Sequence, residues 1–228
     1  MIVRLIMKIK TIILDFDGTI VESVGIKDWA FETLFREYPD KLDEIMRYHL
    51  SHNATIRFEK FKYITENILR QEYNEDVEGG LSRRFSDLVV KKIIECPYVP
   101  GAMEFLEYLY EILPLYLVSV SPGDELDEIL TARDLKKYFK KIYPSSWKKS
   151  DAVVDILREE NLSPKEALFI GDSLEDYQSA QAARVSFIGR DSGRSFQGAR
   201  INVFNDFVAI RAFLENSNVK EGFVCRNI

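Results

Sequence analysis

The sequence is poor in cysteine and histidine and has no long apolar run. Its two cysteines, Cys96 and Cys225, are too few for a disulfide framework and lack metal-ligand spacing. No apolar run approaches the length of a membrane span. Arg4 interrupts the apolar start, no small-residue cleavage site follows it, and either Met1 or Met7 is the true start. We therefore expect a cytoplasmic protein with reduced cysteines and no membrane partner.

Positive charge is also scarce, with 31 Lys and Arg against 37 Asp and Glu and a formal net charge of −6. This balance argues against nucleic acid as the main partner. The 228 residues are 46% hydrophobic and 30% charged, which suits one large or two modest globular domains. The choice between a monomer and a homodimer stays open.

Strand and helix patterns alternate from residue 97 onward, which predicts a parallel sheet with helices on both faces. The apolar run 9–14 predicts a further strand, buried on both faces. From Glu215 the chain reads as a tail. The other expected strands are 115–118, 141–143, 167–170, 185–188 and 201–203, and the expected helices are 102–113, 123–139, 150–160, 174–183 and one ending near residue 214.

Residues 22–96 form an insertion that is charged and helical in period, with no convincing strand. The ordinary explanation of its aromatic residues is that they pack the helices against one another. Gly79-Gly80 predicts a break between two helices. Apolar stripes predict the earlier helices at about 29–38, 42–49 and 58–69.

Polar side chains follow four of the predicted strands. Parallel strands share one edge at their carboxyl ends, and ligands of such sheets bind there. We therefore expect these side chains to gather at one rim. They are Asp15 and Asp17 after the first strand, Ser119 and Ser121 after the second, Lys148 and Lys149 after the third, and Asp172, Glu175 and Asp176 after the fourth.

These residue types suit phosphoryl transfer. Asp15 and Asp17 repel each other unless a cation or a shared proton lies between them. A carboxylate can attack phosphorus, and a second one can move protons to the leaving group and from water. Serine and lysine can balance the charge of a phosphoryl group, and Mg²⁺ prefers oxygen ligands. Gly18 adds backbone freedom next to Asp17, and Thr19 adds a hydroxyl and a helix N-cap.

The run from Ile12 to Thr19 resembles the first motif of the haloacid dehalogenase superfamily of phosphotransferases, four hydrophobic residues followed by DxDx[TV]. The strand-end serine, the lysine and the GDxxxD pattern resemble its other motifs, and together they cover residues 9–188. The resemblance implies an α/β fold with a Rossmann-like catalytic core, residues 1–21 and 97–228. It also implies the phosphoglycolate phosphatase and β-phosphoglucomutase-like branch, in which residues 22–96 form a helical cap.

The resemblance implies that Asp15 is the nucleophile that forms an aspartyl-phosphate and that Asp17 is the general acid and base. It implies Mg²⁺ as cofactor, with ligands from Asp15, Asp17, Asp172 and Asp176. The dehalogenase branch is disfavoured because it lacks an acid at the position of Asp17. Glu175 is expected on the surface of a helix. The implied phosphate-binding residues are Gly18, Thr19, Ser119, Val120 and Lys149.

Two of these positions depart from the family pattern. The family often has proline after the lysine, and neither lysine here has one. Lys149 is preferred because it precedes a helix start at Ser150, and Lys148 is the alternative. Val120 stands where the family commonly has asparagine, which removes one polar contact.

The segment 49–61 is the richest polar stretch of the insertion, and it partly resembles the pattern N-x-G-x-S-R followed by K-F of some capped members. Arg57 is expected to bind a second anionic group of the substrate, with an exposed helix arginine as the alternative. His49 and His52 have the spacing of metal ligands, but no third ligand is evident. Gly25 and residues 98–101 are candidate hinges.

The expected function is Mg²⁺-dependent hydrolysis of a small phosphorylated metabolite, because a phosphoprotein would not fit beneath a closed cap. One alternative is a phosphomutase, which returns the phosphoryl group to a sugar. Another is a non-catalytic binding protein, in which the loss of a rim acid would be expected. Phosphoglycolate, nucleoside monophosphates, sugar phosphates and pyrophosphate are all open as substrates.

Overall fold

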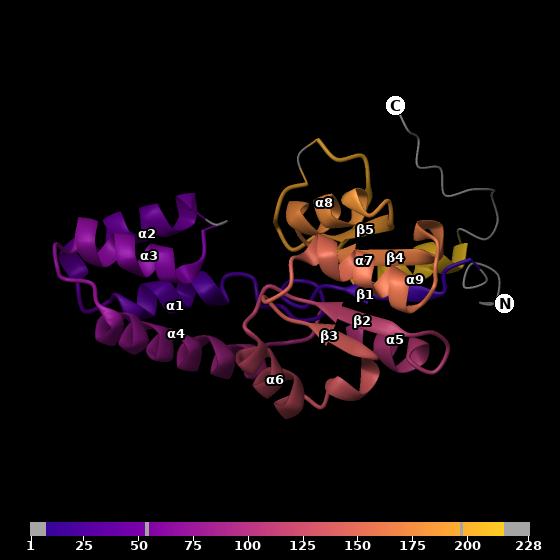
Figure 1. Cartoon of the computed structure of the whole chain (residues 1–228), viewed down its shortest axis with the longest axis horizontal. Helices are drawn as coiled ribbons and strands as arrows, with labels where there is room; N and C mark the ends of the chain where they lie inside the picture. The colour runs from indigo at the N-terminus through magenta and orange to yellow at the C-terminus, as the bar shows by residue number, and fades with distance from the viewer. Residues whose placement is uncertain (1–7, 53–54, 197, 217–228) are drawn as a thin grey trace. The chain divides into compact units, whose positions relative to one another are not determined.

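The computed structural model describes residues 8–52, 55–196 and 198–216. The chain divides into two compact units, residues 1–22 with 96–228 and residues 23–95 (Figure 1). Among the described residues, none of the helices combines the length and the apolar character needed to cross a bilayer.

The first unit contains a six-stranded parallel sheet in the order β3-β2-β1-β4-β5-β6, which confirms the predicted α/β fold. Every residue of the central strands β1 and β2 is buried, as strands covered on both faces should be. The strand order reverses between β1 and β4, so their carboxyl ends border the crevice where such sheets bind ligands. The strands are β1 (Thr11–Leu14), β2 (Leu115–Val118), β3 (Lys141–Tyr143), β4 (Ala167–Gly171), β5 (Ser186–Arg190) and β6 (Asn202–Phe204).

Helices pack on both faces of this sheet (Figure 1). On one face, α7 (Lys149–Glu159) and α8 (Leu174–Ala182) cover a core that includes Tyr116, Ile156 and Phe169. On the other, α5 (Ala102–Leu109) and α9 (Phe207–Asn216) meet through Phe105 and Phe207, whose ring centroids are 4.8 Å apart.

The helix expected over residues 123–139 is shorter than predicted. α6 (Gly123–Ala132) ends before Asp134, whose φ of 54° lies in the left-handed region and cannot continue a right-handed helix. A 3₁₀ turn, Lys136–Tyr138, follows and leads into β3.

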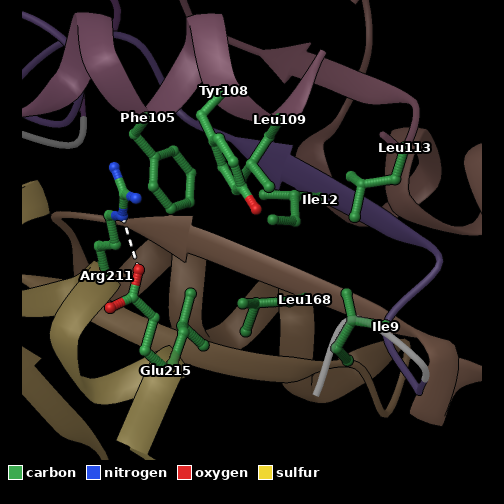
Figure 2. A pocket seen from close by; sticks show the side chains of 10 residues that line it. Ile9, Ile12, Phe105, Tyr108, Leu109, Leu113, Leu168, Arg211 and Glu215 are labelled. Carbon is green, nitrogen blue, oxygen red and sulfur yellow. Dashed lines mark hydrogen bonds and ion pairs between the residues drawn. The ribbon is translucent and has the colours of Figure 1, made fainter. Parts of the chain in front are cut away.

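An apolar pocket lies between α5, α9 and the strands β1 and β4 (Figure 2). Ile12 and Leu168 face it from the two strands, and Phe105 and Leu109 face it from α5. The charged side chains at its border, Arg211 and Glu215, bond to each other at 2.7 Å. Its lining contains none of the acids that follow β1 and β4, so the pocket is separate from the rim where polar residues were expected.

The second unit is helical. Its core contains a cluster of aromatic rings, with the Phe31 centroid 5.4 Å from Phe61 and 5.0 Å from Phe85, so helix packing accounts for these residues. The break predicted at Gly79-Gly80 is wrong, because α4 (Glu75–Glu95) continues through both glycines. A glycine costs a helix interior only about 1 kcal/mol, which burial of Phe85 and other apolar residues of α4 offsets. The helices are α1 (Ile26–Leu34), α2 (Leu42–Ser51), α3 (Arg57–Tyr63) with a π-helical continuation (Ile64–Ile68), and α4 (Glu75–Glu95).

Candidate active site

Three carboxylates come together where β1 and β4 end. Asp15 directly follows β1, Asp172 directly follows β4, and Asp176 lies in the first turn of α8. All three are buried, and each offers an oxygen within 4.8 Å of the others. We call these three residues the carboxylate cluster. The structure thus unites acids that are more than 150 residues apart in sequence.

Local structure holds Asp176 in this cluster. Ser173 is the N-cap of α8, and its backbone N–H donates to Asp176 Oδ2 at 3.1 Å while its hydroxyl donates to the same oxygen at 2.6 Å. Gly171 makes room for the carboxylate, because a Cβ at this position would lie 2.6 Å from the side chain of Asp176. Glycine and the capping serine therefore set the place of this acid.

A buried lysine lies against the carboxylate cluster. Lys149 Nζ is 2.7 Å from Asp15 Oδ1 and 2.6 Å from Asp176 Oδ1. Lys149 is the first residue of α7, which begins one residue earlier than the start predicted at Ser150. Lys148 is the N-cap and is exposed. Of the two candidate lysines, the structure therefore brings Lys149 to the cluster.

Burial and neighbouring charges have opposing effects on the pKa values of Asp15 and Lys149. Burial raises the pKa of the Asp15 carboxyl well above its ordinary value, and the Lys149 ammonium opposes this shift. Burial by itself would lower the pKa of Lys149, but the carboxylates of Asp15 and Asp176 outweigh it and hold that pKa above its usual range. These carboxylates therefore favour the ammonium form of Lys149.

Asp172 adds to the negative charge of the cluster. Burial raises the pKa of its carboxyl, and Arg194, with Nη1 3.4 Å from Asp172 Oδ2, opposes the shift. Apart from this ion pair, the buried Asp172 Oδ2 has no hydrogen-bond partner. Buried carboxylate oxygens that close together are stabilised by a further cation.

Asp17 has a different environment. Its carboxylate is not part of the carboxylate cluster, and its expected role as a metal ligand stays a prediction. Asp17 Oδ2 instead accepts a hydrogen bond from the Ser121 hydroxyl at 3.0 Å, and Ser119 Oγ accepts the backbone N–H of Ser121 at 3.1 Å. No role was predicted for Ser121, although its place after β2 was a usable signal.

The turn after β1 brings the remaining rim residues to the site. Gly18 has φ of 77°, a left-handed conformation that glycine adopts without strain. Thr19 was predicted to cap a helix, and this is wrong, because the next helix begins only at Ile26. The Thr19 hydroxyl instead donates to Asp15 Oδ2 at 3.4 Å.

Val120, which lies after β2, is 45% exposed, so its side chain makes little contact at the rim.

The polar residues predicted in the insertion have partners within the helical unit. The guanidinium of Arg57, at the start of α3, lies 5.2 Å from the ring centroid of Phe58. His49 is buried and its Nε2 is 2.7 Å from Asp28 Oδ1, whereas His52 Nδ1 bonds to the Tyr48 carbonyl at 2.8 Å. The two histidines thus have separate partners. Neither belongs to the one metal-type group found among the described residues.

The chain matches the family model of haloacid dehalogenase-like hydrolases over residues 12–190. It is 24% identical over 196 residues to a phosphoglycolate phosphatase of Pseudomonas syringae pv. tomato, a match that covers 81% of this chain and 70% of that protein. The family resemblance seen in the motifs is thereby confirmed.

Solved structures share the fold. A predicted phosphoglycolate phosphatase from Haemophilus somnus superposes with a TM-score of 0.72 at 19% identity, covering 90% of this chain and 98% of that one. The HAD-hydrolase YfnB from Bacillus subtilis, solved bound to magnesium, gives a TM-score of 0.69 at 16% identity and covers 91% of this chain and 99% of that one.

Proposed function

Because this chain belongs to the haloacid dehalogenase-like hydrolases and is a phosphoric monoester hydrolase, we propose that it hydrolyses a small phosphomonoester through a phosphorylated Asp15. One observation carries the proposal. The Lys149 ammonium lies between Asp15 and Asp176 at 2.7 and 2.6 Å, and all three side chains are buried. Burying such charges is costly, and a nucleophile beside a phosphate-binding cation is a use that explains the arrangement.

Asp15 is the nucleophile of the proposed reaction. A carboxylate oxygen of Asp15 forms a bond to phosphorus while the ester P–O bond breaks, and the alcohol leaves. Water then attacks the phosphorus, and the bond to Asp15 breaks to release inorganic phosphate. Lys149 and the Thr19 hydroxyl bond to different oxygens of Asp15, so they favour the ionised carboxylate and orient it.

Asp17 moves the protons. It gives a proton to the leaving alcohol in the first step and takes one from the attacking water in the second. The hydrogen bond from Ser121 holds one oxygen of its carboxylate. Ser119 and Lys149 are the donors for the phosphoryl oxygens, whose negative charge they stabilise.

The carboxylate cluster fits Mg²⁺ as the cofactor. Asp15, Asp172 and Asp176 offer carboxylate oxygens close together, and Asp172 Oδ2 has no hydrogen-bond partner of its own. Carboxylates combined with phosphate oxygens are the usual environment of this ion. When bound, Mg²⁺ supplies positive charge that screens the phosphate from the nucleophile. Asp17, which the family resemblance also implies as a ligand, accepts a hydrogen bond from Ser121 at its Oδ2.

The substrate is proposed to be a small phosphorylated metabolite, and the helical unit is proposed to be a cap domain. The chain's relative in Pseudomonas syringae is a phosphoglycolate phosphatase. A substrate of that kind carries a second anionic group, for which Arg57 offers a planar guanidinium. Phosphoglycolate is therefore the first compound to test, ahead of sugar phosphates, nucleoside monophosphates and pyrophosphate.

The test is phosphate release from such a panel with MgCl₂. We expect the wild-type protein to release phosphate, EDTA to abolish the release and added Mg²⁺ to restore it. Asp15→Asn should lower kcat at least about a thousandfold, as loss of a nucleophile does. Asp151→Asn is the matched control, because Asp151 is an exposed acid of α7. An isomerised sugar phosphate without phosphate release would indicate the phosphomutase instead, and ligand binding without turnover would indicate a binding protein.

A further inference from the structure

Arg190, the last residue of β5, is a buried cation for which the proposed chemistry has no role. Its side chain is 7% exposed. The guanidinium donates from Nη1 to the Gly18 carbonyl at 3.0 Å and from Nε to the Asn205 carbonyl at 3.2 Å, and Nη2 pairs with the carboxylate of Glu22. Arginine is rarely buried unless its donors are used in this way.

The contact with Gly18 is the informative one. Gly18 directly follows Asp17 and sits in the left-handed region, with its N–H donating to the Val21 carbonyl at 2.9 Å. Glycine has more backbone freedom than any other residue, so a turn built on it needs outside restraints to hold one conformation. Arg190 supplies such a restraint, and a charge-assisted hydrogen bond is a strong one.

The restraint reaches the turn from a distant part of the chain. Gly18 and Arg190 are 172 residues apart, and β4 lies between their strands β1 and β5 in the sheet. Glu22, which neutralises the guanidinium, is the last residue before the helical unit, and its N–H donates to the Pro97 carbonyl at 2.9 Å. Arg190 thus bonds to the turn after β1 and to the segment that leads out of the first unit.

We propose that Arg190 is a positioning residue for the reaction, which holds the Gly18 carbonyl and so fixes the turn that carries Asp17. This inference rests on the proposed function, because it gives Asp17 the role of proton donor and acceptor. Ser121 holds the carboxylate end of Asp17, and Arg190 holds the backbone beside it. Both restraints are needed because a shift of about 1 Å in a reacting group can cost about a hundredfold in rate.

The first measurement compares wild type with Arg190→Ala and with Arg211→Ala. Arg211 is the matched control, since it also pairs with a glutamate but lies at the apolar pocket. We expect Arg190→Ala to lower kcat by about 10–100-fold with KM changed less than about twofold, the pattern of an interaction needed in the transition state. Arg211→Ala should leave both constants unchanged. Guanidinium at about 20 mM should restore part of the kcat of Arg190→Ala, because the vacated site matches that ion, and sodium chloride should not.

The second measurement does not depend on activity. Hydrogen exchange of a peptide covering residues 16–22 should be about tenfold faster in Arg190→Ala than in wild type, while a peptide from α7 should not change. If Arg190→Ala does not fold, Arg190→Lys takes its place. Lysine keeps the charge but lacks the planar fork that reaches three acceptors, so the same peptide should again exchange faster.

Unchanged exchange of residues 16–22 in a folded Arg190 variant would overturn the inference. So would a loss of kcat that Arg211→Ala reproduces. If wild type hydrolyses no substrate, the proposed function fails on its own assay. The exchange comparison still decides whether Arg190 holds the turn.

Discussion

Lys149 donates from its side-chain nitrogen to Asp15 at 2.7 Å, across 134 residues of sequence and between side chains that are each 5% exposed. Lys149 is the first residue of α7, and Asp15 directly follows β1. The two residues therefore come from elements that are far apart in the sequence. Because neither charge is accessible to water, each depends on the other for its protonation state.

Loss of the Lys149 ammonium should damage both activity and stability. We expect Lys149→Met to lower kcat by about 10²–10³-fold, because the phosphoryl oxygens lose a charged donor. The unfolding free energy should fall by about 3 kcal/mol, because buried carboxylates are left without their cation. Lys148→Met is the control, since Lys148 is exposed and should tolerate the change. Urea unfolding and steady-state kinetics measure the two effects, and equal losses in both variants would contradict the assignment of Lys149.

Mg²⁺ binding should depend on Asp172 and not on its neighbour in sequence Glu175. We expect the melting temperature of wild type to rise with MgCl₂, since a ligand that binds only the folded state stabilises it. Asp172→Asn should weaken binding by about tenfold or more, because an amide is a poorer ligand than a carboxylate. Glu175→Gln should bind Mg²⁺ as wild type does, because Glu175 is exposed on α8. Calorimetric titration gives the affinities, and tight binding by Asp172→Asn would place the ion elsewhere.

Gly171 should not tolerate a side chain. A Cβ there would lie 2.6 Å from Asp176, so the carboxylate has to move out of the cluster. We expect Gly171→Ala to destabilise the protein by about 2 kcal/mol and to lose most of the stabilisation by Mg²⁺. Gly123→Ala is the matched substitution, because its Cβ would have its nearest neighbour at 3.5 Å, an ordinary contact. Thermal unfolding with and without MgCl₂ compares the two, and equal behaviour would refute this account of Gly171.

His49 should make the protein less stable in mild acid. Burial lowers the pKa of His49 below its ordinary value of 6.5, although the hydrogen bond with Asp28 opposes this shift. Below pH 6.5 the unfolded chain therefore binds more protons than the folded one, so stability falls as the pH falls. We expect this loss between pH 7.5 and 5.5 to shrink in His49→Gln and to persist in His52→Gln. Urea unfolding at both pH values is the measurement, and an undiminished loss in His49→Gln would assign it to other groups.

The rim acids were predictable because their signals are local. An apolar run such as residues 11–14 has the composition of a buried strand, and an acid directly after it has to lie at the strand's end. Alternation of strands and helices makes the sheet parallel, and parallel strands place all such ends at one edge. Asp15 and Asp172 could therefore be expected together without any knowledge of packing.

Other features, such as which lysine is buried and what Arg190 contacts, depend on tertiary packing and not on any short stretch of sequence. Lys148 and Lys149 are adjacent and alike, and the start of α7 decides which one is buried. The glycines within α4 read as a break, yet the buried face of that helix outweighs their low propensity. Arg190 carries no local signal at all, because its partners Gly18 and Glu22 lie about 170 residues away.

The sequence by itself determined the parallel α/β core, the helical insertion and the set of acids at the strand ends. These follow from hydrophobic period and from the order of elements, which are properties of neighbouring residues. Only the tertiary structure decided that Asp17 turns to Ser121 while Asp15, Asp172 and Asp176 share one cluster with Lys149. The sequence could not predict these contacts because buried charges need partners, and the partners are the groups that the fold brings close to them.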